Sequence, residues 1–571
     1  MTFSKKVSII TYYEYKKEKL GTLSVHCEQT QAVDLTRTCP RGDDIKSGSE
    51  KFSTLSAYTQ GGGADKDCLY SISSGCGGGG LGKALEGCEE SFEGIERLFK
   101  INPSIGFSLK DESNHWMQKT FVFKGRTPAA QPDCGEVLKA LRGFIEPYRQ
   151  VINPLLVGLT GNRDEENCAY SSLSLYWTVI TGFFLRLRSR NQMDMTRNTK
   201  AYSASIFELS GQPYNPDDPK LHTACSQTCT NLLHDVETEA LEKVLVELVR
   251  YMIRSKLFDN ARLFGCLCVA IDGTLCERKR SSVLDAIEKR RYCLEARIIT
   301  PWGWNIPLLT ESVEPYNSER EKQDCELEAF KRLSKRLKRY FPNQGFCILG
   351  DALYACKSVM DICRDYKWEY ILTFKEGSMP RIYENINSAM HRTLQYGLLK
   401  QDSRENEVDS YGLLTWVDGR ETVYEDGEGV NFRVVRMSCW GVGEDSYNGE
   451  FCTSFEVSSF ERAKQVMNYG RRRWNIENGF KVEKYGGFGL EHTFCNDDKA
   501  GKNYHVLMQI AYALWQVFEQ GMLVRLSEKC RKITAEGWAK LLFVGFLMIG
   551  LRYFPVAEIG VMRMRRYHLV A

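Results

Sequence analysis

The chain has 571 residues, of which 43% are hydrophobic and 26% are charged, and its formal net charge is +3. This composition is typical of a globular protein with more than one domain, and it excludes a disordered chain and a polycation. Any binding of nucleic acid must therefore come from local basic clusters. The apolar run 541–551 is too short to span a bilayer, and we expect no secretory signal at the N-terminus.

The 21 cysteines are spread through the chain, and several fall in expected core elements, such as Cys266 and Cys293. This distribution predicts buried thiols in a reducing cytoplasm rather than a disulfide framework. Cys225 and Cys229 have a roughly finger-like spacing, with His222 nearby. No second pair follows at a zinc-finger distance, so the pattern favours buried thiols over zinc here.

Two segments precede the part of the chain that carries the chemistry. Residues 1–130 are predicted to be a loop-rich or poorly ordered extension, because glycine and serine are concentrated between residues 41 and 87. Residues 131–260 are predicted to be mainly helical, because apolar residues recur every three or four positions, as in 237–257. The apolar run 173–187 ends among arginines and predicts at least a core helix.

Two acidic residues follow predicted core strands. Asp272 ends the β-prone run 264–271, and Gly273 should break the strand directly after it. Asp351 ends the run 346–350 and precedes a helical stretch. An acid at the end of a core strand is costly to desolvate without a partner, and a metal ion is one partner that accepts several carboxylates. Each acid alone could instead cap a helix or stabilise a turn.

The further elements complete a recognisable pattern. They are strands at 293–300, 304–311 and 368–374, a hairpin turn at 301–303, and a helix at 322–340. Three hairpin-linked strands followed by alternating helices and strands predict an α/β fold with a ribonuclease-H-like catalytic core, preceded by the mainly helical domain. The predicted bounds are 261–374 and 458–525 for the core, 375–457 for a β-rich insertion, and 526–571 for a C-terminal helical and basic segment.

A third acid lies on a predicted helix over residues 471–484. Offsets of 4 and 11 residues place Arg473, Glu477 and Lys484 on one face of that helix. Neighbouring apolar side chains, Trp474 among them, are expected to pack the helix down. The alternative is an exposed helix whose charges form i,i+4 ion pairs.

Together these motifs resemble a DDE transposase of the bacterial insertion-sequence type, in the IS-four family and its close kin. The resemblance runs from about residue 135 to about residue 525, and its motifs are Val269-Ala-Ile-Asp272-Gly-Thr274, residues 321–333, Leu349-Gly-Asp351-Ala-Leu-Tyr354, Arg473-Trp-Asn-Ile-Glu477-Asn-Gly-Phe480 with Lys484, Gly489-Leu-Glu-His492 and Gln509-Ile-Ala511. The family's helix usually has a tyrosine three residues before the arginine. Gly470 stands there in this chain and Tyr469 precedes it, so the phosphate contact of that tyrosine is not carried over.

The resemblance implies cleavage at the transposon's terminal repeats, followed by attack of the freed 3′-hydroxyl on target DNA. Two Mg²⁺ ions, for which Mn²⁺ could substitute, would activate water and stabilise the leaving oxygen. Asp272 is expected to bridge the ions, with Asp351 binding one and Glu477 the other. The expected partners are terminal inverted repeats and target DNA, the expected assembly on DNA is a homodimer, and the expected location is the bacterial cytoplasm at the nucleoid, without a membrane.

Several residues are expected to contact the DNA. Arg473 and Lys484 would hold the backbone beside Glu477. Further backbone candidates are Arg472, Lys481, Lys335 and Arg339. The last two lie on the basic face of the helix 322–340, and a solvated face is the alternative. Candidates for stacking on an unpaired base are Trp416 and Trp440, with ordinary sheet packing as the alternative. The helical domain 131–260 would be the module that binds DNA ends, or an accessory domain.

Two other functions fit the same residues. The chain could be a structure-specific nuclease of the same fold without strand transfer, or a domesticated DNA-binding protein without catalysis. The basic helix and the insertion favour a transposase over a nuclease. The presence of all three acids argues against a catalytically silent protein.

Overall fold

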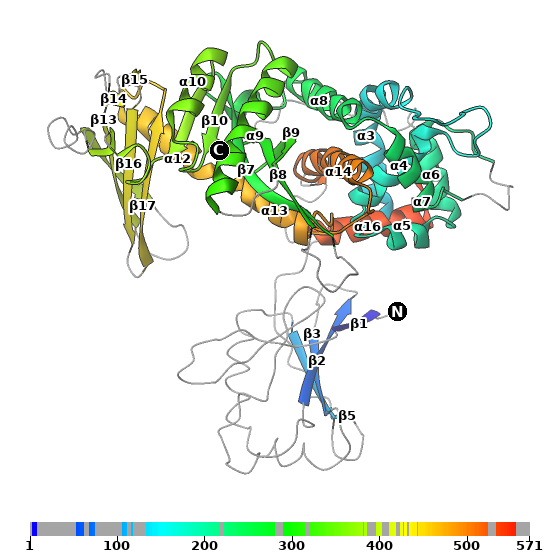
Figure 1. The fold of residues 1–571 in the computed structure, drawn as a ribbon. Helices are drawn as coiled ribbons and strands as arrows, with labels where there is room; N and C mark the ends of the chain where they lie inside the picture. The colour runs from blue at the N-terminus through cyan, green and yellow to red at the C-terminus, as the bar shows by residue number, and fades with distance from the viewer. Residues whose placement is uncertain are drawn as a thin grey trace. The chain divides into compact units, whose positions relative to one another are not determined.

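A computed structural model describes residues 133–215, 222–279, 289–313, 319–380, 382–384, 395–401, 410–417, 423–425, 428–430, 433–441, 444–523 and 533–554, together with five strands nearer the N-terminus. The chain divides into two units, Met1–Gln131 and Pro132–Ala571 (Figure 1). Within these described ranges, no helix is both long enough and apolar enough to cross a membrane.

The first unit contains a five-stranded sheet with the strand order β1-β2-β3-β4-β5. Its strands are β1 (Phe3–Val7), β2 (Ser53–Gly61), β3 (Cys68–Ser74), β4 (Ile105–Lys110) and β5 (Trp116–Met117). Strands β3 and β4 pair in parallel, and the other neighbours pair antiparallel. Most of the segment predicted to be loop-rich or poorly ordered, including the glycines at 77–80, lies outside the described residues.

The second unit is built on a ten-stranded mixed sheet. Its central strands are β7 (Cys266–Lys279), β8 (Lys289–Ile299), β9 (Asn305–Ser312), β10 (Phe346–Gly350) and β11 (Glu369–Thr373), and the short β6 (Arg262–Leu263) pairs with β7 after the turn η2 (Asp259–Ala261). Strands β9, β8 and β7 are antiparallel neighbours, whereas β10 runs parallel to both β7 and β11. Helix α9 (Glu319–Tyr340) connects β9 to β10, and α10 (Lys357–Tyr366) connects β10 to β11. The mixed α/β class is therefore as predicted.

Strand β7 does not end where the sequence suggested. It continues past Asp272 to Lys279, because β8 supplies a partner for every added residue except Cys276, which lies at a bulge; Asp272 itself pairs with Glu295. Gly273 does not break the strand. A Cβ atom at Gly273 would lie 2.2 Å from the hydroxyl of Tyr292, so glycine is needed there for packing.

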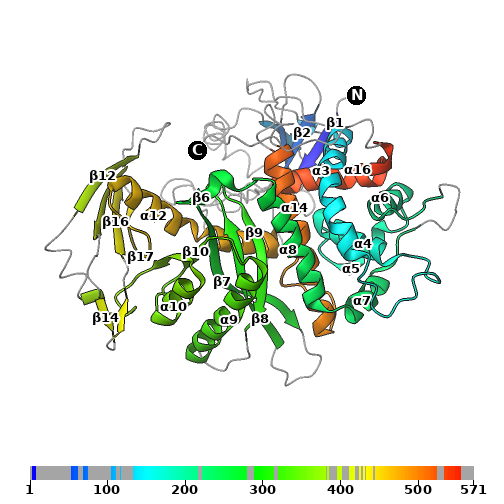
Figure 2. The ribbon, with the colours of Figure 1, turned by 90° about the horizontal axis from the view of Figure 1, so that it is seen from above.

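The predicted insertion extends the core sheet. Its strands are β12 (Gln395–Gln401), β13 (Ser410–Val417), β16 (Arg433–Gly441) and β17 (Glu444–Thr453), with a separate hairpin of β14 (Val423–Glu425) and β15 (Glu428–Val430). The order is β12-β13-β16-β17-β11, and β17 pairs antiparallel with β11 (Figure 2). This pairing covers the edge that β11 would otherwise expose, which is a usual way to protect a sheet edge.

The helices beside the sheet come from both sides of the core in sequence. They are α3 (Cys134–Leu156), α4 (Ser172–Phe184), α5 (Arg190–Thr196), α6 (Lys200–Ser210), α7 (Ser226–Asp235), α8 (Thr238–Arg254), α14 (Asp498–Phe518) with its π-helical end Glu519–Leu523, α16 (Ala535–Met548) and a final turn Leu551–Tyr553. Helix α14 is buried along most of its length and packs against α4, α7, α8 and β9 (Figures 1 and 2). The domain bounds predicted within this unit remain a prediction.

Candidate active site

The predicted helix over residues 471–484 is two helices in the structure. Helix α12 (Phe460–Arg472) ends at Arg472, and α13 (Asn475–Tyr485) begins at Asn475. Between them, the amides of Arg473 and Trp474 bond to carbonyl groups three residues back, at 3.2 and 3.3 Å. The backbone stays right-handed through this tightened turn, with φ −47° and ψ −39° at Arg473. Arg473 therefore still reaches Glu477, four positions later.

Arg473 connects two of the three predicted acids. Its Nη1 lies 3.4 Å from Oδ2 of Asp272, and its Nη2 donates to Oε1 of Glu477 at 2.9 Å. Arg473 is only 8% exposed, so this is not the exposed i,i+4 pair of the alternative interpretation. The structure thus brings Asp272 of β7 and Glu477 of α13 to opposite sides of one guanidinium group.

The third acid belongs to the same electrostatic environment. Asp351 directly follows β10, the strand beside β7, and its Oδ1 accepts a hydrogen bond from the amide of Leu353 at 2.9 Å. Burial raises the pKa of Asp272 to about 7; Arg473 opposes the increase, while Glu477 and Asp351 add to it. Such a shift marks a group under electrostatic stress, as is common at functional sites.

The three carboxylates do not form a closed ligand set. Among the described residues, the one group of three possible metal ligands whose atoms all lie within 4.8 Å of each other is Cys276, Cys293 and His505. The guanidinium of Arg473 contacts both Asp272 and Glu477. A cation shared by these two acids would have to replace one of the contacts of Arg473.

A cleft of about 690 Å³ opens beside Asp351, between the end of the core strands and the inserted strands. Its lining includes Arg473, Trp474 and Lys375, which lies two residues after the end of β11. Trp474 is 56% exposed, so the expectation that it packs the helix down is wrong. The sequence analysis missed Lys375, although it follows β11 much as Asp351 follows β10. The carboxyl ends of parallel strands meet at one sheet edge, and that rule could have identified it.

Two of the expected DNA contacts on α12 and α13 have partners within the chain. Lys484 pairs with Glu491 at 3.0 Å, and the guanidinium of Arg472 lies over the ring of Tyr469 at 4.9 Å. Lys481 is exposed. Tyr469 is buried and its hydroxyl donates to the carbonyl of Ala261 at 3.0 Å, so it does not replace the missing family tyrosine.

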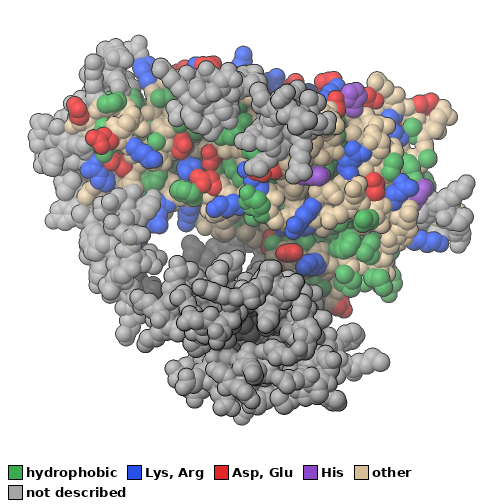
Figure 3. Space-filling view, turned by 60° about the horizontal axis from the view of Figure 1, so that its bottom comes forward, with side chains coloured by type: hydrophobic (Ala, Val, Ile, Leu, Met, Phe, Trp, Pro, Cys, Tyr) green, Lys and Arg blue, Asp and Glu red, His purple; other side chains and the backbone are tan. Residues whose placement is uncertain are grey.

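The basic face of α9 is largely occupied by ion pairs. The arginines of α9 pair with acids on α8 and β9: Arg332 with Glu311 (3.1 Å), Arg336 with Glu311 (2.7 Å) and Glu242, and Arg339 with Glu239 (2.6 Å). Lys335 is exposed. These pairs attach α9 to its neighbours, which favours the structural alternative over a continuous DNA track. On the face drawn in Figure 3, basic and acidic side chains are likewise interspersed.

The remaining candidates are the two tryptophans proposed to stack on a base and the finger-like set of two cysteines and one histidine. Trp416 is buried and packs against Phe460, with ring centroids 6.2 Å apart, so it has the predicted sheet-packing role. The side chain of Trp440 lies outside the described residues. The finger-like set does not assemble: Cys225 contacts Thr228 at 3.3 Å, Cys229 is buried against the carbonyl of Leu175, and His222 contacts Tyr170 at 3.0 Å.

A buried charged network, which the sequence analysis missed, supports α13. Arg297 of β8 donates to Oε2 of Glu295 at 2.8 and 2.6 Å and also binds Glu483 of α13. Its Nη1 donates to Oδ1 of Asn305 at 3.2 Å, and its guanidinium lies over the ring of Phe480. Because Glu483 and Glu477 share one helix, this network positions Glu477 relative to the sheet.

Gly479 is the contact point of α13 with this network. A Cβ atom there would lie 2.1 Å from Oδ1 of Asn305 and 2.7 Å from Nη1 of Arg297. We expect Gly479→Ala to lower the free energy of unfolding by about 1–3 kcal/mol, because the helix must move away from β8. Urea unfolding monitored by circular dichroism measures this change in the free energy of unfolding. Gly158→Ala, where a Cβ atom meets nothing within 4 Å, is the control. An unchanged unfolding midpoint in Gly479→Ala would contradict this contact.

Comparison with known proteins adds one family match. Residues 313–540 match the family model described as transposase DDE domain group 1. The matched range includes Asp351 and Glu477, and it begins after Asp272. This match supports a DDE transposase and does not single out the IS-four family. A search of curated proteins finds no match. Among solved structures, the piggyBac transposase in a synaptic complex with hairpin DNA is 9% identical, with a TM-score of 0.35 over 77% of this chain and 86% of that chain. A similarity this weak carries no argument.

Proposed function

We propose that the chain is a DDE transposase that cleaves DNA at transposon ends and joins the freed 3′ ends to target DNA. The observation that carries the proposal is the family match over Asp351 and Glu477, combined with the position of Asp272 beside Glu477. The match supplies two acids in a DDE domain. The contacts of Arg473 add a third acid, from a strand that the matched range does not include.

The core is proposed to be ribonuclease-H-like. The strand order β9-β8-β7-β10-β11, with three antiparallel strands followed by two parallel ones, supports this assignment. Asp272 and the residue before Asp351 lie on adjacent strands, and α13 packs against β7 and β8. The fold would therefore place two acids on the sheet and deliver the third from a helix.

The three acids are proposed to hold a pair of Mg²⁺ ions, or Mn²⁺ in their place, once the ions replace a contact of Arg473. Carboxylates are the ligands that these ions prefer, and the raised pKa of Asp272 reflects burial and repulsion that a divalent cation would offset. Asp272, Asp351 and Glu477 would hold the ions through their carboxylates. When bound, the ions would activate water and stabilise the leaving oxygen. Arg473 balances the negative charge of Asp272 and Glu477 and keeps α13 aligned with β7.

The DNA is proposed to enter the cleft beside Asp351. Lys375 and Trp474 present a cation and an exposed aromatic ring there, which suit a phosphate and an unstacked base. Arg473 is buried between acids and is proposed to position them rather than to bind the backbone. Lys484, paired with Glu491, can contact a phosphate if that pair opens. Terminal repeats and target DNA are the proposed partners, with a homodimer on the DNA, in the cytoplasm of a bacterium.

The test uses the purified full chain, Mg²⁺ and a plasmid that carries the DNA surrounding this reading frame. We expect breaks at the two boundaries of the element and products in which its 3′ ends are joined to new DNA. Breaks without joined products would identify a nuclease of the same fold. Binding without breaks would identify a non-catalytic DNA-binding protein, and either outcome would reject the transposase assignment.

Trp474→Ala tests the role of the cleft in binding DNA. We expect the affinity for a cleaved end with an unpaired terminal base to fall by roughly 1–3 kcal/mol, because one base loses its stacking partner. Gel-shift titration measures this affinity, and thermal unfolding checks that the variant is folded. Tyr485→Ala removes a 72% exposed aromatic residue at the end of α13 that does not line the cleft, and this variant should bind normally. Equal affinities of the two variants would reject the stacking role.

A further inference from the structure

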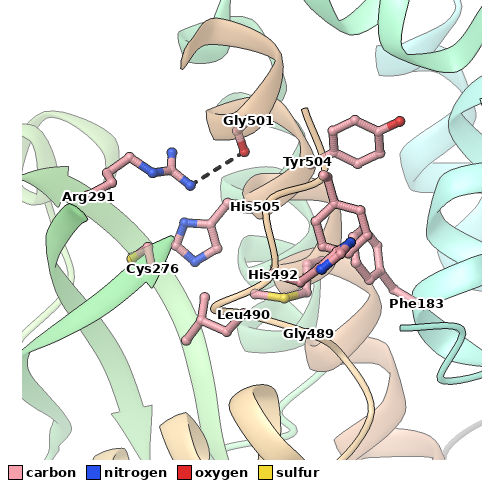
Figure 4. A pocket seen from close by; sticks show the side chains of 11 residues that line it. Phe183, Cys276, Arg291, Gly489, Leu490, His492, Gly501, Tyr504 and His505 are labelled. Atoms are coloured by element: carbon pink, nitrogen blue, oxygen red, sulfur yellow. Dashed lines mark hydrogen bonds between the residues drawn. The ribbon is translucent and has the colours of Figure 1, made fainter. Parts of the chain in front are cut away.

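A second cluster of possible ligands lies apart from the three acids. Cys276 of β7, Cys293 of β8 and His505 of α14 are buried, and one ligand atom from each lies within 4.8 Å of the other two. Figure 4 shows Cys276 and His505 facing each other across the space between the strand and α14. The β7–β8 hairpin and α14, which are distant in sequence, therefore bring two thiols and one imidazole close together.

Two polar atoms at this point lack a satisfactory hydrogen bond. Nε2 of His505 lies 3.0 Å from Oε1 of Glu295, yet neither atom has a hydrogen-bond partner of acceptable geometry. Both residues are buried, where an unsatisfied polar atom is costly.

The donor set has the chemistry of a zinc site. Two thiolates and an imidazole are ligands that Zn²⁺ prefers, whereas Mg²⁺ prefers oxygen ligands. With bonds of about 2.3 Å to sulfur and about 2.0 Å to nitrogen, tetrahedral coordination places donors roughly 3.3–3.8 Å apart. The observed separations, all within 4.8 Å, need only small side-chain movements to reach that range. A carboxylate beside the imidazole is the usual companion of a metal-bound histidine.

Strands β7 and β10 carry a comparison pair of cysteines. Cys268 of β7 and Cys347 of β10 are also buried and face each other in register across the sheet. This pair belongs to no group of three possible metal ligands among the described residues. Two buried thiols alone are ordinary core packing, so the added imidazole and carboxylate distinguish the first cluster from the second. A disulfide between Cys276 and Cys293 would leave His505 and Glu295 unexplained.

We propose that Cys276, Cys293 and His505 bind one structural zinc ion, with Glu295 completing or orienting the site. The ion would tie α14 to the β7–β8 hairpin. Asp272 lies four positions before Cys276 on the same strand and pairs with Glu295 across the hairpin. The zinc would thereby hold rigid the strand that carries Asp272, without taking part in the chemistry at the acids.

Metal content tests the proposal without any assay of activity. The full chain is purified under reducing conditions from cells grown with zinc, and its metals are measured by mass spectrometry. We expect about one zinc ion per chain in the wild type and in the control Cys347→Ser. Cys276→Ser and Cys293→Ser should each retain less than about a fifth of that amount, because a structural site loses most affinity with one thiolate. Zinc retained in both variants, or absent from the wild type, would overturn the proposal.

A second measurement covers variants that fail to fold. Zinc is removed from the wild type with a chelator, and the reduced protein is titrated with Co²⁺. We expect the absorption bands of tetrahedral cobalt bound to thiolate, with one ion bound per chain. Their absence would overturn the proposal. So would a disulfide between Cys276 and Cys293 in the protein purified without reductant, identified by mass spectrometry of its peptides.

Discussion

Glu477→Gln should abolish DNA cleavage while DNA-end binding survives. The change keeps the shape of the side chain and removes the charge that would bind a metal ion. If the carboxylate supplies about 4 kcal/mol of transition-state stabilisation, the cleavage rate falls on the order of 10³-fold. Binding should remain or tighten, because one negative charge near the phosphates is lost. The fold should survive, because Arg473 keeps its contact with Asp272.

Cleavage of a labelled transposon end in Mg²⁺, run beside gel-shift titrations at several salt concentrations, measures both effects. Glu456→Gln is the matched control, because Glu456 is exposed and lies away from the three acids in the loop before α12. A simple helix ion pair predicts a stability loss on the order of 0.5 kcal/mol and normal cleavage. A Glu477→Gln protein that cuts at the normal rate would therefore rule out the proposed role of Glu477.

Arg297→Leu should destabilise the protein by about 3–5 kcal/mol, the usual cost of removing one partner from a buried ion pair. Arg297, Glu295 and Glu483 are all fully buried, and the change leaves two carboxylates without their shared cation. Chemical unfolding of the wild type and variant measures the difference. Arg339→Leu, which breaks an exposed pair with Glu239, should have little effect and serves as the control.

The loss of stability caused by Arg297→Leu should depend on pH. Burial already raises the pKa of Glu483 to about 7 in the wild type, although Arg297 opposes the increase. An acid whose pKa is higher in the folded than in the unfolded state favours folding at low pH and loses that contribution as pH rises through the folded value. Without Arg297 the pKa of Glu483 rises further, so the destabilisation should be larger at pH 8 than at pH 5. Adding Glu483→Gln should restore part of the loss at pH 8. A loss of equal size at both pH values would show that Arg297 acts through packing alone.

Local pattern was sufficient for elements whose character depends on their own residues. The run 346–350 is continuous and apolar, and it forms the buried strand β10 that leads to Asp351. The predicted hairpin at 301–303 is also present, with Gly303 at φ +97° allowing the turn. The three acids became candidates through the residues around them, because an acid after an apolar run and an acid beside an arginine on a helix are visible in sequence. Arg473 and Glu477 still make the contact predicted from their four-residue spacing, although Arg473 lies in the turn between α12 and α13.

Only the tertiary structure decided which partner each side chain meets. Periodicity indicates an apolar face, but it does not identify the element that covers it. The sequence therefore could not separate buried Trp416 from exposed Trp474, or show that the arginines of α9 are held by acids of α8 and β9.

The same reason explains the extent of β7 and the two buried clusters. β7 continues beyond Asp272 because β8 pairs with it, and the insertion joins the core because β11 has an open edge. The contacts of Arg297 with Glu483, and of His505 with Cys276, join residues far apart in the chain. Such contacts cannot be predicted from the composition and spacing of one segment, because the contacts depend on how whole elements pack together.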